Sequence, residues 1–222
     1  AAVLAFMTAG CGRLSTEPIF DIKKNLSNVP SYSILLEDMK QKGNFFKDYF
    51  HKYRVVQEND SNVTGWMEVS KDFYRQNENF LGMVLAGRVD GKDIATAAPP
   101  GYQYLGNPTY GRWVSDGRGG SFWEFYGKYS LMRDCFGGWY GPSISRGSYK
   151  KYRGYHSRKK PYFGLNNKYG SSGSIVKKTR PDFFRRSQVT SASKKSSFSD
   201  KVSKRIGRKR TSMRSRSGGK GK

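Results

Sequence analysis

Positive charge is concentrated in the last third of this chain, and the asymmetry limits how much of the chain can fold. Residues 1–145 carry 16 Lys and Arg against 15 Asp and Glu, whereas residues 146–222 carry 25 against two. The second segment also has only six Leu, Ile and Val residues. It therefore buries too little apolar surface to offset the conformational entropy lost on folding. The sequence predicts a folded body over 32–145 and a basic, mostly disordered tail over 146–222.

The first half of the body has the pattern of a small antiparallel sheet. Four strands are predicted from alternating or short apolar runs, over 32–39, 45–57, 63–69 and 81–86. Asp90-Gly91 is typical of a two-residue hairpin turn. Ser70 has the side chain of an N-cap and predicts a helix over 71–79. We therefore expect an α+β fold, with a small antiparallel sheet and one or two helices.

The second half of the body is rich in glycine and aromatic residues. Ser121 and Glu124 have the spacing of a capping box, and aromatic residues follow them at helical spacing, which predicts a helix over 121–136. This helix either packs on the sheet or lies in a membrane interface with its aromatic face down. Packing on the sheet is the favoured alternative, because few cations flank the helix.

The N-terminal residues have the composition of a processing signal. Residues 1–10 are small or apolar and carry no charge, and they are too few to span a membrane. Since no Met precedes them, we expect a truncated signal-peptide core. The alternative is a buried helix or strand with Cys11 in the core.

The run ends in Thr8-Ala9-Gly10-Cys11, which resembles the lipobox of bacterial lipoprotein precursors. The resemblance implies lipidation of Cys11, palmitate included, and makes residues 11–31 a lipid-anchored tether. Two or three acyl chains give stable membrane anchoring where one does not. It also implies the bacterial cell envelope as the location, and the outer membrane in a Gram-negative species, because Gly12 rather than Asp follows the cysteine.

The basic tail has the composition of a polyanion-binding segment. In its first part cations alternate with tyrosines, which suits phosphate contacts combined with base stacking, and equally suits anionic lipid head groups. A third alternative is a solvated spacer. The predicted polyanion-binding residues are Lys150, Lys151, Arg153, Arg158, Lys159, Lys160, Arg208, Lys209 and Arg210.

Catalytic and metal-binding patterns are weak in this sequence. Two cysteines and two histidines offer no zinc-site spacing, and no acid–base set converges. His51 falls in an aromatic strand and is interpreted as a structural residue. We expect no enzyme activity, no cofactor and no metal.

The leading functional hypothesis is a lipid-anchored bacterial envelope protein with a binding or structural role. Its cationic tail would contact anionic envelope polymers or lipid head groups, and Cys11 would hold it at the membrane. The alternative is an intracellular nucleic-acid-binding protein that uses the basic aromatic tail to bind RNA.

Overall fold

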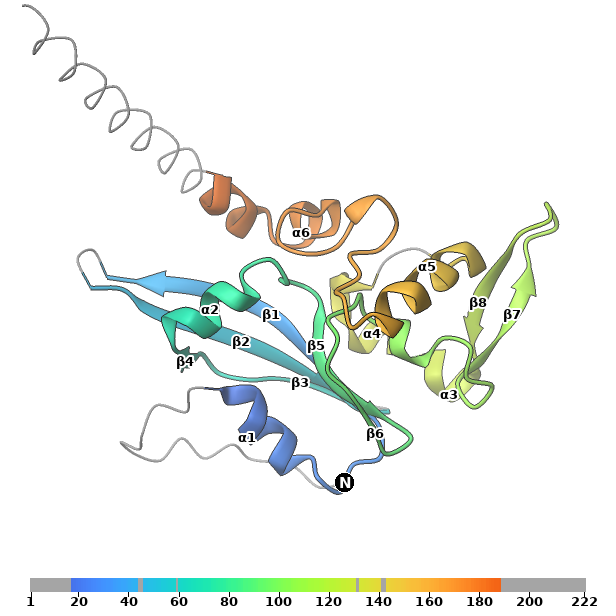
Figure 1. Cartoon of the computed structure of the whole chain (residues 1–222), viewed down its shortest axis with the longest axis horizontal. Coiled ribbons are helices and arrows are strands. Elements are labelled where there is room, and N and C mark those ends of the chain that lie inside the picture. Colours follow the sequence, from blue (N-terminus) through green and yellow to red (C-terminus); the bar gives the residue numbers. More distant parts are fainter. Residues whose placement is uncertain (1–16, 44–45, 59, 131, 141–142, 189–222) are drawn as a thin grey trace, which may run out of the picture. The chain divides into compact units, whose positions relative to one another are not determined.

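The computed structural model describes residues 17–43, 46–58, 60–130, 132–140 and 143–188 (Figure 1). Contacts divide the chain into a compact unit that ends at Thr179 and a second unit that begins at Arg180. Cys11 in the first sixteen residues, and the predicted cations Arg208, Lys209 and Arg210, lie outside the described residues. The disorder expected for 189–222 therefore stays a prediction.

An antiparallel sheet of six strands organises the compact unit, and the predicted α+β class is confirmed at this level. The strands are β1 (Tyr32–Lys42), β2 (Asp48–Val56), β3 (Ser61–Val63), β4 (Met67–Val69), β5 (Val84–Val89) and β6 (Lys92–Ile94). Their order is β3-β2-β1-β5-β6, and β4 also pairs with β2. The predicted third strand over 63–69 is thus divided into β3 and β4. Asp90 and Gly91 form the two-residue turn between β5 and β6, both with positive φ, as a type I′ turn requires.

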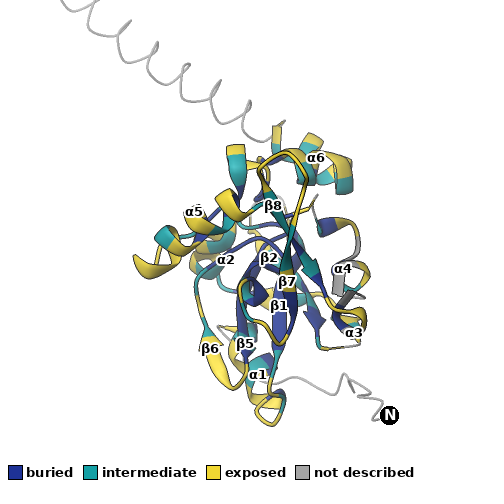
Figure 2. Ribbon diagram, turned by 90° about the vertical axis from the view of Figure 1, so that its right-hand side faces the viewer, coloured by how far each residue is buried: buried dark blue, intermediate teal, exposed yellow. Residues whose placement is uncertain are grey.

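Two short helices cover one face of the sheet. They are α1 (Pro18–Asn25) and α2 (Lys71–Asn77). The predicted Ser70 cap is present, because the Ser70 Oγ accepts a hydrogen bond from the Phe73 backbone N–H at 3.1 Å. On this face the His51 ring of β2 lies 5.7 Å from the Phe73 ring of α2. Figure 2 shows the buried residues gathered in the central strands, while the outer sides of the helices are exposed.

The aromatic, glycine-rich segment covers the opposite face. Its elements are the 3₁₀ helix η1 (Tyr102–Tyr104), strands β7 (Gly111–Ser115) and β8 (Ser121–Phe125), helices α3 (Gly127–Ser130) and α4 (Met132–Cys135), and the 3₁₀ helix η2 (Gly137–Trp139). Successive side chains of a strand point to opposite faces. Ser33 and Glu37 of β1 accordingly meet this segment: the Ser33 hydroxyl bonds Tyr104 at 2.9 Å and the Glu37 carboxylate bonds Trp139.

The prediction of one continuous helix over 121–136 is wrong. Residues 121–125 form β8, which pairs with β7 in a separate hairpin, and Trp123 stands opposite Trp113 with ring centroids 5.1 Å apart. Aromatic residues favour strands, and cross-strand aromatic pairs stabilise them, so the apparent helical spacing did not decide the structure. Helix begins only at Gly127, and the described part contains more helices than the one or two expected.

The compact unit extends well past residue 145, where the basic tail was expected to begin. Beyond that point lie α5 (Arg146–Ser157), the 3₁₀ helix η3 (Leu165–Asn167) and α6 (Ser174–Thr179). Tyr152, Tyr162 and Tyr169 are buried, so tyrosine supplies the apolar surface that the scarce aliphatic residues do not. In the second unit, residues 181–188 are helical.

A buried carboxylate joins the sheet to the aromatic segment. Glu37 is 4% exposed, and its Oε2 accepts hydrogen bonds from Arg54 Nε and Trp139 Nε1, each at 2.9 Å. Arg54 lies on the adjacent strand and Trp139 in η2, so three distant parts of the chain meet at one oxygen. A buried charge without its partner is strongly destabilising, which makes this contact sensitive to the loss of either donor.

Replacing Arg54 with Met is expected to lower the free energy of unfolding by about 3 kcal/mol, because the buried Glu37 carboxylate loses a charged donor at 2.9 Å. Urea denaturation at neutral pH measures the loss. The matched control is Arg112→Met, which breaks the exposed Arg112–Glu124 pair at the same 2.9 Å distance. That change should shift stability by less than about 1 kcal/mol. Equal losses in the two variants would contradict a special role for the buried contact.

Candidate polyanion-binding surface

Helix α5 and the turn after it carry six of the nine cations that the sequence indicated. It begins after Ser145, whose Oγ accepts a hydrogen bond from the Ser148 backbone N–H at 3.2 Å, and it runs for twelve residues to Ser157. Arg158 caps its C-terminus. The next residue, Lys159, has a φ of 53° and turns the chain out of the helix.

One face of α5 is fixed to the core by hydroxyl groups. Ser148 and Tyr152, four residues apart and therefore on the same face of the helix, are 2% and 6% exposed. The Ser148 Oγ lies 2.6 Å from the Tyr102 hydroxyl and 3.0 Å from the Tyr162 hydroxyl. Burial raises the pKa of Tyr102 above its ordinary value and that of Tyr152 to about 12. These phenols therefore stay neutral, and the helix is held by a buried hydrogen-bonded cluster.

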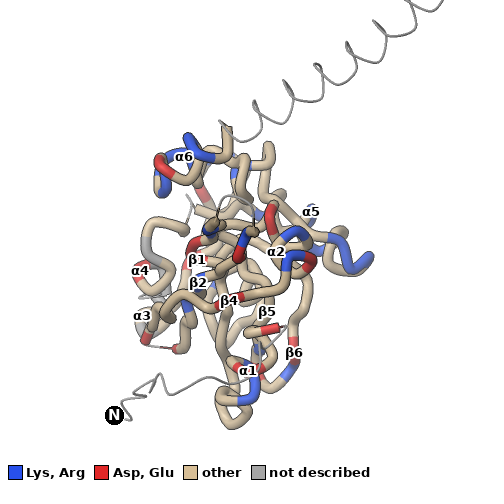
Figure 3. Tube along the Cα trace, turned by 90° about the vertical axis from the view of Figure 1, so that its left-hand side faces the viewer, with Lys and Arg blue, Asp and Glu red and all other residues tan. Residues whose placement is uncertain are grey.

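The opposite side of α5 and the turn after it are cationic. Residues 146–179 contain ten Lys and Arg and no Asp or Glu. We define the basic surface as the exposed cations of α5 and its following turn: Arg146, Lys150, Lys151, Arg153, Arg158, Lys159 and Lys160. Within the described residues, none of the seven forms an ion pair with a carboxylate. Figure 3 shows the cations as a blue stretch along α5 and beyond it.

Aromatic rings stand beside these cations. Trp113 of β7 lies 5.5 Å from Tyr149, ring centroid to ring centroid. The guanidinium carbon of Arg146 is 5.8 Å from the centroid of Trp113, and that of Arg153 is 6.0 Å from the centroid of Tyr149. Both rings are half-buried, so each is held in place and still offers surface to a ligand. In such an arrangement the cations can pair with phosphate or carboxylate groups of a ligand. The half-exposed rings can at the same time stack on a base or lie at a lipid interface.

Six of the nine cations predicted to bind polyanions are thus brought together on one helix and its C-terminal turn. Sequence reasoning placed Tyr149 in the aromatic and cationic stretch, but it did not include Arg146 among the binding cations and did not indicate Trp113. The Ser145 cap and the four-residue spacing of Ser148 and Tyr152 were local signals for the helix. Trp113 comes from a strand more than thirty residues earlier in the chain, and no local pattern indicates that contact.

The histidine in the sheet has a structural environment. His51 is fully buried, its Nδ1 lies 3.0 Å from the Tyr53 hydroxyl, and Tyr74 packs on its ring. Burial lowers its pKa from 6.5 to about 4. Burial also raises the pKa of the Cys135 thiol, which disfavours a nucleophilic thiolate.

A metal-binding cluster and a membrane-spanning helix are both absent from the described residues. They contain no group of three or more His, Cys, Asp or Glu side chains arranged to hold a metal ion. No helix among them is long and apolar enough to cross a membrane.

Comparisons with protein-family models, with curated proteins and with solved structures found no significant match to this chain.

The buried His51 predicts a loss of stability in mild acid. The unfolded chain takes up a proton below about pH 6.5, whereas the folded state does so only near pH 4. Stability is therefore complete above pH 6.5 and falls between these values, by on the order of 3 kcal/mol. Urea denaturation across this pH range should show a shallower pH dependence for His51→Asn than for the native chain. A native-like slope in His51→Asn would contradict the assignment.

Proposed function

We propose that the protein binds a polyanion through the basic surface of α5. One observation carries the proposal: four exposed cations on α5 and three in the turn after it have no carboxylate partners in the described chain, and the other face of the helix is fixed by buried hydroxyl contacts. A helix holds its cations in a defined arrangement. Binding therefore orders fewer groups than binding by a disordered segment would.

The partner in this proposal is an anionic polymer or lipid head group of a bacterial cell envelope. The lipobox-like Thr8-Ala9-Gly10-Cys11 supports an envelope location, with the lipid on Cys11. The tether expected over 11–31 is confined in this proposal to the residues before α1, because Ile22 and Leu26 are buried in the compact unit. Anchoring at the N-terminus would keep the basic surface close to membrane phosphates, which raises the effective concentration of the partner. The role is then binding or structural rather than catalytic.

A second candidate partner is RNA, and a specific observation favours it. Trp113 and Tyr149 lie beside Arg146 and Arg153, an arrangement in which aromatic rings can stack on unpaired bases while guanidinium groups contact phosphates. The two candidates differ in compartment and in the chemistry of the bound polymer. A direct comparison of anionic vesicles with single-stranded RNA separates them.

Removing three cations of α5 tests the surface. In the full chain, Lys150→Gln with Lys151→Gln and Arg153→Gln should weaken binding to phosphatidylglycerol vesicles by about two orders of magnitude, because each cation contributes about 1 kcal/mol at an anionic membrane. If RNA is the partner, the same variant should instead reduce the salt dependence of polyuridylate binding, by about two units of slope. Vesicle sedimentation and fluorescence anisotropy are the measurements.

The matched control removes three exposed lysines from other elements: Lys24→Gln, Lys71→Gln and Lys92→Gln. Its net charge equals that of the α5 variant. If the control binds nearly as tightly as the native chain and the α5 variant does not, the interaction is located at the basic surface. Equal losses would mean that total charge alone drives binding and would contradict a defined surface.

The lipid anchor is tested by changing Cys11. Expressed in a bacterial host behind a complete signal peptide, the native chain should carry acyl chains by mass spectrometry and sediment with membranes in high salt. Cys11→Ser should lack the acyl mass and appear in the soluble fraction, since one thiol is the proposed attachment point. Cys135→Ser serves as the control and should remain acylated. A Cys11→Ser variant that stays in the membrane fraction in high salt would contradict the anchor.

A further inference from the structure

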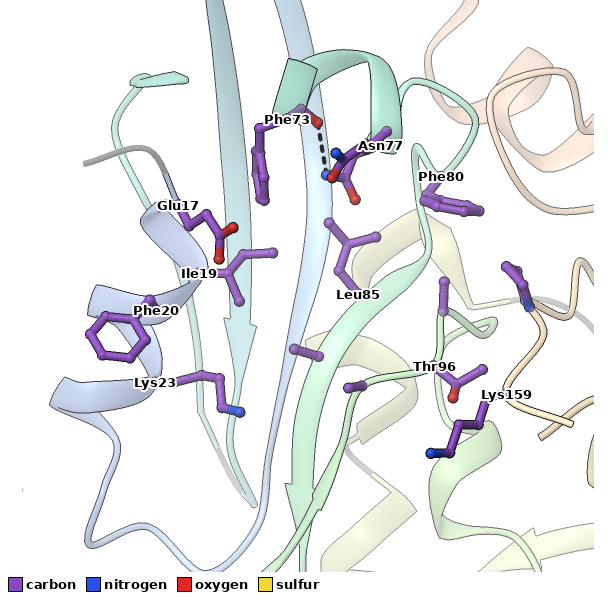
Figure 4. A pocket seen from close by; sticks show the side chains of 15 residues that line it. Glu17, Ile19, Phe20, Lys23, Phe73, Asn77, Phe80, Leu85, Thr96 and Lys159 are labelled. Atoms are coloured by element: carbon purple, nitrogen blue, oxygen red, sulfur yellow. Dashed lines mark hydrogen bonds between the residues drawn. The ribbon is translucent and has the colours of Figure 1, made fainter. Parts of the chain in front are cut away.

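A groove of about 520 Å³ lies on the sheet face that α1 and α2 cover (Figure 4). Leu85 and Ala86 of β5 line it, together with Ile19 of α1 and Phe73 of α2. Its volume falls in the range of about 300–1,000 Å³ that is typical of small-molecule sites. The groove shares one residue, Lys159, with the basic surface, and none of the α5 helix residues lines it.

Short helices and small side chains keep this groove open. The two covering helices have only eight and seven residues, and Leu85 and Ala86 of β5 line the space between them. Ala86, Ala95 and Ala97 contribute little volume where larger side chains would fill the space. Ile19 and Phe73 remain only half-buried as a result. Apolar surface facing water in a concave site favours an apolar ligand, since covering it releases that surface from solvent.

The two ends of the groove differ in charge. Figure 4 shows Glu17 at one end, and Thr96 with Lys159 towards the other. The groove also contains Lys23, but its ammonium is paired with the Asp93 carboxylate at 2.7 Å. Among the described lining residues, Lys159 is the lysine with no carboxylate partner. An anionic group is therefore attracted to the Lys159 end and repelled at the Glu17 end.

The backbone at Lys159 adds a second, independent observation. The Lys159 N–H bonds the His156 carbonyl and the Lys160 N–H bonds the Tyr155 carbonyl, each at 3.0 Å, which is the hydrogen-bond pattern of a Schellman motif. That motif places its left-handed residue, normally glycine, at position 159. A side chain in this conformation costs about 1 kcal/mol. The position therefore carries an ammonium group against the local backbone preference.

We infer that the groove binds a long-chain carboxylate. Its hydrocarbon chain lies on Leu85 and Ala86, between Ile19 and Phe73, and its carboxylate pairs with the Lys159 ammonium beside Thr96. The inference goes beyond the polyanion-binding function and does not depend on it, because the ligand is a small amphiphile held by one cation and an apolar floor.

Titration calorimetry of the full chain with dodecanoate, below its micelle concentration, is the test. One dodecanoate should bind per chain, and Lys159→Gly should weaken binding at least about tenfold, the effect of losing one ion pair of about 1.4 kcal/mol. Glycine suits the left-handed backbone, so Lys159→Gly should unfold at the same or a higher temperature than the native chain. This result separates loss of binding from loss of folding. Dodecanol, which lacks the charge, should bind equally to the native and Lys159→Gly chains.

Two further variants locate the site. Lys160→Gln removes the same charge from the neighbouring residue, which does not line the groove, and should bind dodecanoate as the native chain does. Ala95→Leu fills part of the groove from an exposed position and should abolish binding. Three results would each overturn the inference: the native chain fails to bind dodecanoate, Lys159→Gly and Lys160→Gln lose equal affinity, or Ala95→Leu binds as tightly as the native chain. The triple α5 variant should bind dodecanoate normally, so failure of the polyanion-binding function remains distinguishable.

Discussion

The pairing of buried tyrosine hydroxyls with serine side chains is the contact on which the compact unit depends. Tyr104 bonds Ser33 at 2.9 Å, Tyr110 bonds Ser31 at 2.8 Å, and Ser148 joins Tyr102 to Tyr162. A buried tyrosine provides a large apolar area, but a hydroxyl left without a partner costs about 1–3 kcal/mol. Because each hydrogen bond requires its two oxygens to lie within about 3 Å, these pairs also restrict the positions of η1 and α5 relative to the elements that they contact.

The tyrosine–serine contacts explain which parts of the fold could be predicted from the sequence. Strands β1 and β2, the Asp90-Gly91 turn and the Ser70 cap depend on neighbouring residues, and local patterns predicted them. Residues 121–125 were predicted as helix because aromatic residues at three- and four-residue spacing satisfy a helical template. These residues form strand β8 instead, because they pair with β7, a contact that local sequence patterns do not indicate. Residues 146–179 were assigned to the tail on their few aliphatic residues, which undervalued Tyr152, Tyr162 and Tyr169 as core residues.

The candidate sites divide in the same way. Composition was enough to indicate the cations, since Lys150, Lys151 and Arg153 stand in a stretch that contains no acidic residue. Their placement on one helix, beside Trp113, was not predictable from local sequence because it depends on Ser148 meeting Tyr102. The groove was not predictable at all: Leu85, Ile19 and Phe73 meet there only through the packing of α1 and α2 on the sheet.

Within residues 17–179, the unbalanced charge is confined to 146–179, and this affects the encounter with a partner rather than the affinity for it. Residues 17–145 carry 15 cations and 15 anions, while residues 146–179 add ten cations and no anion. Such a separation gives the unit an electric dipole moment, and a polar body rotates in the field of a charged surface before it touches that surface. The unit would then approach a negatively charged partner with α5 leading, and fewer collisions would be lost to unproductive orientations. Added salt would slow the approach by screening that field beyond a Debye length of about 10 Å.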